Sequence, residues 1–284
     1  MAGIALLAAA CSNECVNEPD EVMAPVKVQV EGFAISQEEM PATRGTAVES
    51  YTSVKMLTLA FYKSDGTESY KTTQLRDDAF TYATFGEFST SLPMGSYTMV
   101  VIGYCGTSPF TMTSATLATC NDERLQDTFV STQAVNITSN AAMNLTAALD
   151  RVVSRLGVRS SDSRVAEATK MRMTFSAGAR NFNPTTGFAA TNTGFANTIA
   201  FSAAAGAITQ SSSYLFLDTD EQTMDVTIET LDDADNVLFT KTVTDVPFKR
   251  NRMTLLTGNI FTAGSSVSAI TVNSDWLDDY PLGF

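Results

Sequence analysis

The segment Met224-Asp225-Val226-Thr227-Ile228-Glu229-Thr230-Leu231 alternates apolar and polar residues with a period of two. Such alternation is typical of a β-strand that buries one face and exposes the other to solvent. The segment 232–236 is rich in Asp and Asn, which favour turns, and the alternation then returns in Val237-Leu238-Phe239-Thr240-Lys241-Thr242-Val243. We therefore predict an antiparallel hairpin, and this hairpin sets the expected fold class.

Segments of the same kind recur along the chain. Val26-Lys27-Val28-Gln29-Val30 alternates in the same way. Val54–Tyr62 is rich in apolar residues and ends at Ser64-Asp65-Gly66, a hairpin-type turn. Tyr97–Tyr104 is almost continuously apolar, which predicts a strand in the middle of its sheet.

The two halves of the sequence follow a similar order of elements: strand, acidic turn, strand, turn with proline, long strand. Short strands separated by turns, without helical periodicity, indicate antiparallel sandwiches. We predict an all-β fold with two β-sandwich domains in tandem, at 45–149 and 150–284, the second opening with a strand near 150–158. One short helix is expected at 122–129.

The composition excludes several classes of function. The net charge is −13 and the sequence pI is about 4.4, which argues against binding to the phosphate backbone of nucleic acid. The chain has no histidine, so Ser–His or Cys–His nucleophiles and histidine-ligated zinc are excluded. Glycosidases need only two carboxylates, but one Trp and eight Tyr offer few aromatic platforms for sugars. We do not expect an enzyme.

The amino-terminal residues show the pattern of an export signal. An apolar run, Ile4–Ala10, ends at Cys11, and polar residues follow at once. This junction is typical of a lipoprotein processing site, and the run is shorter than the roughly 20 residues of a membrane-spanning helix. We expect residues 1–11 to be a signal remnant with a lipidated Cys11, so that the membrane is contacted only through the lipid. The alternatives are an ordinary cleaved signal or a disordered apolar start.

The remaining cysteines raise the question of a disulfide. Cys105 and Cys120 flank one loop, and an exporting compartment would permit a bridge between them. Closing that loop would contribute on the order of 3 kcal/mol. The alternative is a pair of free buried thiols.

Clusters of acidic residues are better explained as turns than as metal sites. The cluster Asp232–Asn236 lacks the glycine and the distal glutamate of an EF-hand loop, and Asp and Asn favour hairpin turns on conformational grounds alone. We expect no metal and no cofactor.

Several features, in their order along the chain, resemble the fimbrillins, the subunits of type V fimbriae of Gram-negative anaerobes and their minor tip or anchor relatives. In sequence order they are the lipoprotein-like Cys11, the strand Val26–Ile35, the loop Ala42-Thr43-Arg44-Gly45, the strand Val54–Tyr62, the turn Leu92–Tyr97, the strand Arg151–Arg155, the turn Pro247–Asn251 and the last strand Val267–Val272. The resemblance spans most of the chain.

The resemblance implies a transthyretin-like fold for both sandwiches and an assembly mechanism. Many subunits of the family are exported to the outer membrane as lipoproteins and cut by a trypsin-like, arginine-specific protease, after which the first strand is lost. Residues 12–44 then correspond to a tether and removable strand, cut between Arg44 and Gly45. The alternative for Arg44 is an uncut surface loop, as in the lipidated anchor members of the family, which escape cleavage.

A strand from the next subunit would fill the groove left by the first strand, giving a head-to-tail polymer. The candidate donor residues are Val267, Ala269, Ile270, Val272 and Trp276. The alternatives are an edge strand within the chain for 267–272 and a core position for Trp276. We expect a structural subunit of a surface fimbria, with other subunits, the protease and a host or bacterial receptor as partners. The alternative is a surface lipoprotein that binds glycan or protein ligands without polymerising.

Overall fold

The computed structural model of the chain describes residues 22–34, 51–76, 85–263 and 267–273. These residues form nineteen strands and no helix, which confirms the all-β fold class. Within these ranges there is consequently no helix long and apolar enough to cross a membrane.

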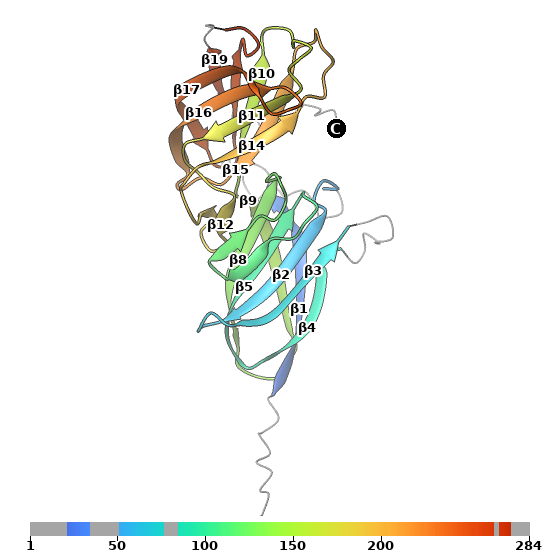
Figure 1. Cartoon of the computed structure of the whole chain (residues 1–284). Helices are drawn as coiled ribbons and strands as arrows, with labels where there is room; N and C mark the ends of the chain where they lie inside the picture. Colours follow the sequence, from blue (N-terminus) through green and yellow to red (C-terminus); the bar gives the residue numbers. More distant parts are fainter. Residues whose placement is uncertain (1–21, 35–50, 77–84, 264–266, 274–284) are drawn as a thin grey trace, which may run out of the picture.

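The first half of the chain builds a seven-stranded sheet with the order β3-β2-β5-β8-β9-β1-β4. Its strands are β1 (Met23–Ala34), β2 (Met56–Lys63), β3 (Glu68–Leu75), β4 (Glu87–Pro93), β5 (Gly95–Tyr104), β8 (Thr128–Ile137) and β9 (Met143–Arg151). β8 and β9 share only two residue pairs, Phe129 with Arg151 and Val130 with Asp150. The sheet is therefore nearly divided there, and Figure 1 shows β2 and β5 passing in front of β1.

The two parts of this sheet enclose one hydrophobic cluster. Its buried members include Leu57, Leu59 and Phe61 from β2, Met99 and Val101 from β5, Val26 and Val28 from β1, Phe88 from β4 and Leu149 from β9. Because β5 pairs with β2 on one side and β8 on the other, the expectation that Tyr97–Tyr104 lies inside its sheet is confirmed.

A second hydrophobic cluster joins the two halves of the chain. Met56, Tyr62 and Tyr104 lie on the other face of β2 and β5 and pack with Phe182 and Phe216 from the second half. A small sheet, β13-β12-β7-β6, also takes strands from both halves. Its strands are β6 (Thr111–Ser114), β7 (Leu117–Thr119), β12 (Asn181–Asn183) and β13 (Phe188–Ala189).

The second half of the chain forms two four-stranded sheets around a third cluster. One has the order β15-β10-β18-β19, with β10 (Ser154–Ser160), β15 (Gln210–Leu215), β18 (Met253–Gly258) and β19 (Val267–Asn273). The other has the order β14-β11-β16-β17, with β11 (Lys170–Phe175), β14 (Phe195–Ala200), β16 (Glu221–Leu231) and β17 (Val237–Lys249). Core residues of both include Leu156, Met173, Val226 and Leu256.

The antiparallel hairpin predicted for Met224–Leu231 and Val237–Val243 is confirmed. β16 pairs with β17 in antiparallel register, with Thr227 opposite Thr242. The turn between them is held by the Asp232 carboxylate, which accepts hydrogen bonds from the backbone N–H groups of Ala234 (2.9 Å) and Asn236 (2.8 Å). The acidic cluster thus has a conformational role in this turn.

The helix expected at 122–129 is wrong. Residues 122–127 form a loop without regular structure, and β8 begins at Thr128. The loop is fixed by side chains instead: Asp122 accepts hydrogen bonds from the backbone N–H and the hydroxyl of Thr107, both at 2.8 Å. These tertiary contacts replace the backbone hydrogen bonds that a helix would have made.

Candidate functional site

The candidate site is the slot that β1 occupies between two other strands. β1 is antiparallel to β4, with Val26 opposite Thr90, and parallel to β9, with Val26 opposite Met143. Among the described residues β4 pairs with no other strand, and β9 pairs otherwise only with β8, over two residues. The main-chain hydrogen bonding of this part of the sheet therefore depends on β1.

The side chains of β1 alternate as its sequence predicts. Ala24, Val26, Val28 and Val30 point into the first cluster and are at most 2% exposed. Between them, Pro25, Lys27, Gln29 and Glu31 are exposed. Small and β-branched residues suit a pleated, half-buried surface. The slot thus consists of four inward positions that accept short apolar side chains.

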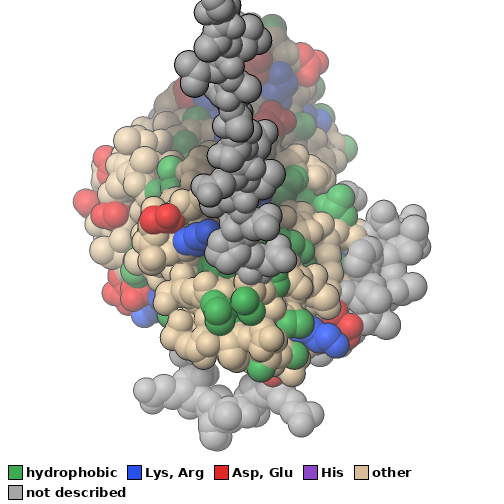
Figure 2. Space-filling model, turned by 90° about the horizontal axis from the view of Figure 1, so that it is seen from below, with side chains coloured by type: hydrophobic (Ala, Val, Ile, Leu, Met, Phe, Trp, Pro, Cys, Tyr) green, Lys and Arg blue, Asp and Glu red, His purple; other side chains and the backbone are tan. Residues whose placement is uncertain are grey.

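The slot has a defined end on each side. At the far end the register of β1 against β9 shifts between Val30 and Gly32, and the backbone N–H of Val30 donates to the carbonyl of Gly86 at 2.9 Å. At the near end the exposed hydrophobic residues Val22, Met23 and Met94 lie beside one another, since Met23 pairs with Pro93. Figure 2 looks onto this end and shows a mostly uncharged surface with a few hydrophobic side chains.

Several predicted site residues lie outside the described residues: Cys11, Arg44, Gly45 and Trp276. In sequence, Arg44 and Gly45 fall between the end of β1 at Ala34 and the described segment that begins at Tyr51. Cleavage and lipidation therefore stay predictions.

The predicted donor strand 267–272 is placed as β19 at the edge of its own sheet. It pairs antiparallel with β18 on one side, with Ile270 opposite Leu256 and Val272 opposite Thr254. Val267 and Ala269 pair with Gly258 and Thr257. In this structure the segment is thus the intramolecular edge strand considered as the alternative. A role as donor requires that it leave β18.

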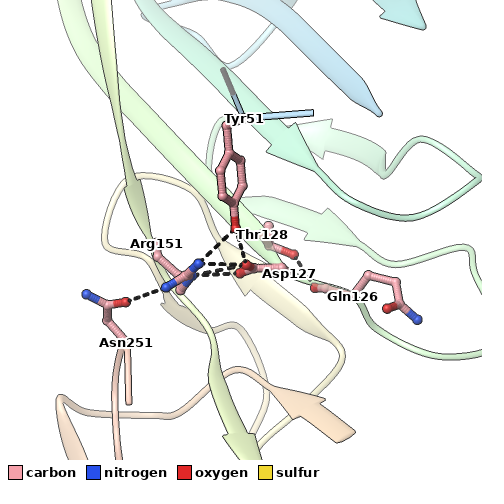
Figure 3. Close-up of polar contacts among 6 residues, drawn as sticks. All are labelled: Tyr51, Gln126, Asp127, Thr128, Arg151 and Asn251. Atoms are coloured by element: carbon pink, nitrogen blue, oxygen red, sulfur yellow. Dashed lines mark hydrogen bonds and ion pairs between the residues drawn. The ribbon is translucent and has the colours of Figure 1, made fainter. Parts of the chain in front are cut away.

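A buried ion pair lies at the junction of the two halves (Figure 3). The Arg151 guanidinium donates to the Asp127 carboxylate from Nε to Oδ1 and from Nη2 to Oδ2, both at 2.9 Å. The side chains of Arg151 and Asp127 are 2% and 8% exposed. Arg151 ends β9, a wall of the slot, so the pair connects the slot to the rest of the molecule.

Two further residues complete this network, and both come from distant parts of the sequence. Arg151 Nη2 donates to the Tyr51 hydroxyl at 3.1 Å, and Nη1 donates to Asn251 Oδ1 at 3.2 Å. Asn251 lies between β17 and β18 and has a left-handed backbone (φ 56°). Tyr51 also meets Phe129 edge to face at 5.5 Å between ring centroids. The network therefore ties the segment after the predicted cleavage loop to both halves of the chain.

The electrostatics of this network keep the Arg151 guanidinium charged and the Tyr51 hydroxyl protonated. Burial alone would lower the pKa of Arg151, but the Asp127 carboxylate raises it above its ordinary value. Burial, together with Asp127, raises the pKa of Tyr51, so its hydroxyl stays protonated. A buried pair of this kind is satisfied only while all of its partners are present.

No pattern in the sequence predicts that Tyr51, Asp127, Arg151 and Asn251 form a group. Local sequence patterns do not show that these residues are in contact, because Asp127 and Arg151 are 24 residues apart and Arg151 and Asn251 are 100 residues apart. The signal that could have found Arg151 is its place between Leu149 and the pair Val152-Val153 in a predicted strand. A charged residue in a buried strand needs a partner.

In this structure Cys105 and Cys120 are free thiols, which is the alternative considered beside a disulfide. Cys105 packs against the first hydrophobic cluster, whereas Cys120 belongs to the second. Cys120 Sγ lies 3.3 Å from the Tyr104 hydroxyl. Burial raises the pKa of the Cys105 thiol well above its ordinary value, which favours the unreactive protonated form. Both cysteines therefore act as small core residues.

Solved structures with a similar fold come from Bacteroides and Porphyromonas. The fimbrial anchor protein Mfa2 from Porphyromonas gingivalis has a TM-score of 0.50 and 12% identity, with 89% of this chain and 98% of that chain covered. A proposed polysaccharide-binding protein (DUF1812) from Bacteroides thetaiotaomicron has a TM-score of 0.51 and 11% identity, with 88% and 96% covered. A proposed adhesin from Bacteroides ovatus has a TM-score of 0.50 and 10% identity, with 88% and 93% covered. At these identities the likeness shows the fold.

A family model described as a family of unknown function (DUF6562) matches residues 24–281. The match begins inside β1 and extends past β19. It therefore includes the slot, its occupant and the candidate donor segment. No curated protein matches the sequence.

Proposed function

The chain belongs to the DUF6562 family of unknown function, and from this premise we propose that it is a structural subunit of a cell-surface fimbria that serves in adhesion. The proposal is supported by the fold shared with a fimbrial anchor protein and a proposed adhesin. It is also supported by the position of β1, which is inserted between two strands and precedes the predicted cleavage loop.

The proposed subunit has four parts. Residues 1–11 are the signal remnant with lipidated Cys11, and 12–44 are the tether and removable strand. Residues 45–149 and 150–284 are two transthyretin-like sandwiches in tandem. The subunit is carried to the outer membrane by its lipid and ends in the fimbrium.

Assembly begins when an arginine-specific protease cuts between Arg44 and Gly45. β1 is then joined to the rest of the chain only by non-covalent contacts. Its departure would leave β4 without its strand partner and β9 with an open edge, and open edges pair readily with strands of other chains. A strand of the next subunit enters the slot, and the contact repeats head to tail.

The four inward positions of the slot set the requirement for the donor. A donor strand must present short apolar residues at alternate positions, where β1 presents Ala24, Val26, Val28 and Val30. The segment 267–272 offers Ile270 and Val272 in one alternate set, and Val267 and Ala269 in the other. Trp276 continues the set of Ile270 and Val272 along the sequence. The register we propose places Ser268, Ile270, Val272 and Ser274 at the four inward positions, because Ile270 and Val272 are β-branched like the valines of β1. Trp276 then falls beyond these four positions.

The observation that carries this proposal is the burial of β1 between β4 and β9. The test is the amino-terminal sequence and the mass of the protein recovered from surface filaments. A mature chain that begins at Gly45 supports the mechanism. Arg44→Ala should prevent assembly, whereas the control Arg159→Ala, at an exposed position of β10, should assemble normally. Normal filaments from Arg44→Ala would refute cleavage at this site.

A second candidate function is a surface lipoprotein that binds glycan or protein ligands and does not polymerise. It is favoured by the similarity to the proposed polysaccharide-binding protein. This alternative requires a mature, monomeric chain that begins at lipidated Cys11. A mature chain that begins at Gly45 would exclude this alternative, whereas one that begins at Cys11 fits either this alternative or an uncleaved anchor subunit, and the presence or absence of the chain in filaments then separates the two.

A further inference from the structure

A polar pocket of about 320 Å³ lies at the open side of the second half of the chain. It is lined by β14 and β15, which are the outermost strands of their two sheets at one end of each. Figure 1 shows the two strands at the end of this half that faces the first half. The segment 124–126, from the first half, supplies the remaining wall. The volume is at the lower end of the range of small-ligand sites, roughly 300–1,000 Å³.

The inner wall of this pocket is polar where the neighbouring core is apolar. Ser211 and Ser213 pair with Val158 and Leu156 of β10 and are 6% and 3% exposed. Because directly paired residues share a face of the sheet, the two serines stand on the same face as these core residues. The core face therefore changes from aliphatic to hydroxyl-bearing side chains at β15. Such a change is expected where polar groups are to be bound.

Asn197 of β14 provides an unsatisfied acceptor in this wall. Its side chain is 2% exposed, and its Nδ2 donates to Ser213 Oγ at 2.5 Å. Its Oδ1 accepts no hydrogen bond within the described part of the chain. A buried amide oxygen without a donor is unfavourable. A ligand hydroxyl or N–H would relieve this cost if the Asn197 side chain turned its oxygen toward the pocket.

The rest of the lining combines hydrogen-bond donors and acceptors without negative charge. The polar groups are serine and tyrosine hydroxyls, the amides of Gln126, Asn197 and Gln210, and the guanidinium of Arg124. No Asp or Glu lines the pocket, although the chain has 31 acidic residues. Hydroxyls and amides both donate and accept, which matches a ligand whose own groups do the same.

The pocket continues into a second hollow. Arg124, Ile199 and Ala200 line both spaces. In the second hollow Lys170 and Arg172 are paired with Asp235 at 2.7 Å and Glu229 at 2.6 Å. Their charges are therefore compensated, and the extended groove favours a linear ligand of low charge.

We propose that this groove binds a short oligosaccharide. Sugar hydroxyls would bond to the serine and amide groups, and Ile199 would contact the apolar face of a ring. A peptide is disfavoured because an added β-strand gains its specificity from apolar pockets for alternate side chains, and most residues of this lining carry a hydroxyl or amide group. The site would give a subunit a means of attachment to a surface, and it goes beyond the role in assembly.

The test is a titration of the purified full-length chain with defined sugars, followed by calorimetry and saturation-transfer NMR. The probes are maltotriose, mannobiose, N-acetyllactosamine and sialyllactose. At least one is expected to bind, and Gln126→Ala and Asn197→Ala should each weaken it about three- to tenfold. The control Gln133→Ala removes the same amide from β8, outside the lining residues, and should leave the affinity unchanged.

Circular dichroism shows whether Asn197→Ala remains folded, and Gln126→Ala tests the same site at a half-buried position of a loop. Absence of binding by all four probes would overturn the proposal, as would binding that neither pocket variant weakens. The titration is repeated with Arg44→Ala. An unchanged affinity there shows that sugar binding is independent of processing, so this proposal and the proposed assembly can fail separately.

Discussion

β1 and β19 lie close to the two ends of the described chain but are held in very different ways. β1 has a partner strand on each side, and four of its side chains are buried in the first cluster. β19 is an edge strand with a single partner, β18. A strand with two partners leaves a slot when it departs, whereas an edge strand leaves one more open edge.

This difference assigns complementary roles to the two strands. The packing of the first cluster and the pairing of β4 depend on β1. Loss of β1 therefore strongly favours the binding of another strand in the slot. β19 makes fewer contacts that would have to be broken before it could serve another molecule. We therefore treat β1 as the strand to be displaced and 267–276 as the proposed donor. The experiments below test this difference between the two strands.

The largest expected effect is on the oligomeric state. Deletion of residues 1–44 opens the slot, and we expect the shortened chain to form oligomers that grow with concentration. Truncation after Ala263 removes β19 and leaves the slot filled, so this chain should stay monomeric. Size-exclusion chromatography with light scattering distinguishes them. If both shortened chains are monomers of similar stability, the contrast between the strands is wrong.

Arg151→Met should have the next largest effect, because it leaves the Asp127 carboxylate buried without its cation. Loss of one partner of a buried pair costs about 3–5 kcal/mol of unfolding free energy. The control Arg172→Ala breaks the more exposed pair with Glu229 and should cost about 0–1 kcal/mol. Denaturant unfolding of both variants gives the comparison. Equal costs would show that the junction network has no special role.

A smaller effect is expected from a single side chain of β1. Val28→Ala removes two methyl groups from the first cluster and should lower the unfolding free energy by about 2 kcal/mol. Val22→Ala makes the same change at a residue that is 47% exposed and should cost less than about 0.5 kcal/mol. Chemical denaturation under identical conditions measures both. A small cost at Val28 would mean that the slot is loosely packed.

The smallest effect concerns pH. Burial acts to raise the pKa of Asp122, but hydrogen bonds from Thr107 outweigh it and hold the pKa below the ordinary value. A carboxylate with a lowered pKa stabilises the fold above its unfolded pKa of about 3.9, and this contribution is lost as the pH falls through the folded pKa. We expect Asp122→Asn to lose part of the acid dependence of stability below about pH 4. An unchanged pH profile in thermal unfolding would contradict this.

The strands could be predicted from local patterns, because burial of one face imposes a period of two on the sequence. The hairpin of β16 and β17 and the alternation in β1 are of this kind. The parallel pairing of β1 with β9 could not be predicted, since it joins residues more than 100 positions apart and depends on the packing of the whole first half. For the same reason the partners of Arg151 were missed.

The wrong helix and the open question of the cysteine pair have physical causes as well. Residues 122–129 have a composition that suits a helix, but Asp122 and Asp127 bond to distant partners and these contacts decide the local structure. The spacing of Cys105 and Cys120 suits a bridge, but it does not reveal that the two residues pack against different clusters. Local patterns therefore predict the strands, whereas the slot around β1 could be recognised only in the three-dimensional structure.

The central claim is that β1 is a replaceable occupant of its slot. The most direct measurement treats the purified chain with a trypsin-like protease and follows polymer growth by light scattering, with and without an excess of a synthetic peptide of residues 22–35. Our account predicts that the cleaved chain polymerises, that the peptide stops growth by refilling the slot, and that a peptide with Asp at positions 26 and 28 does not. Polymers that grow equally well with the native peptide, or a cleaved chain that stays monomeric, would contradict it.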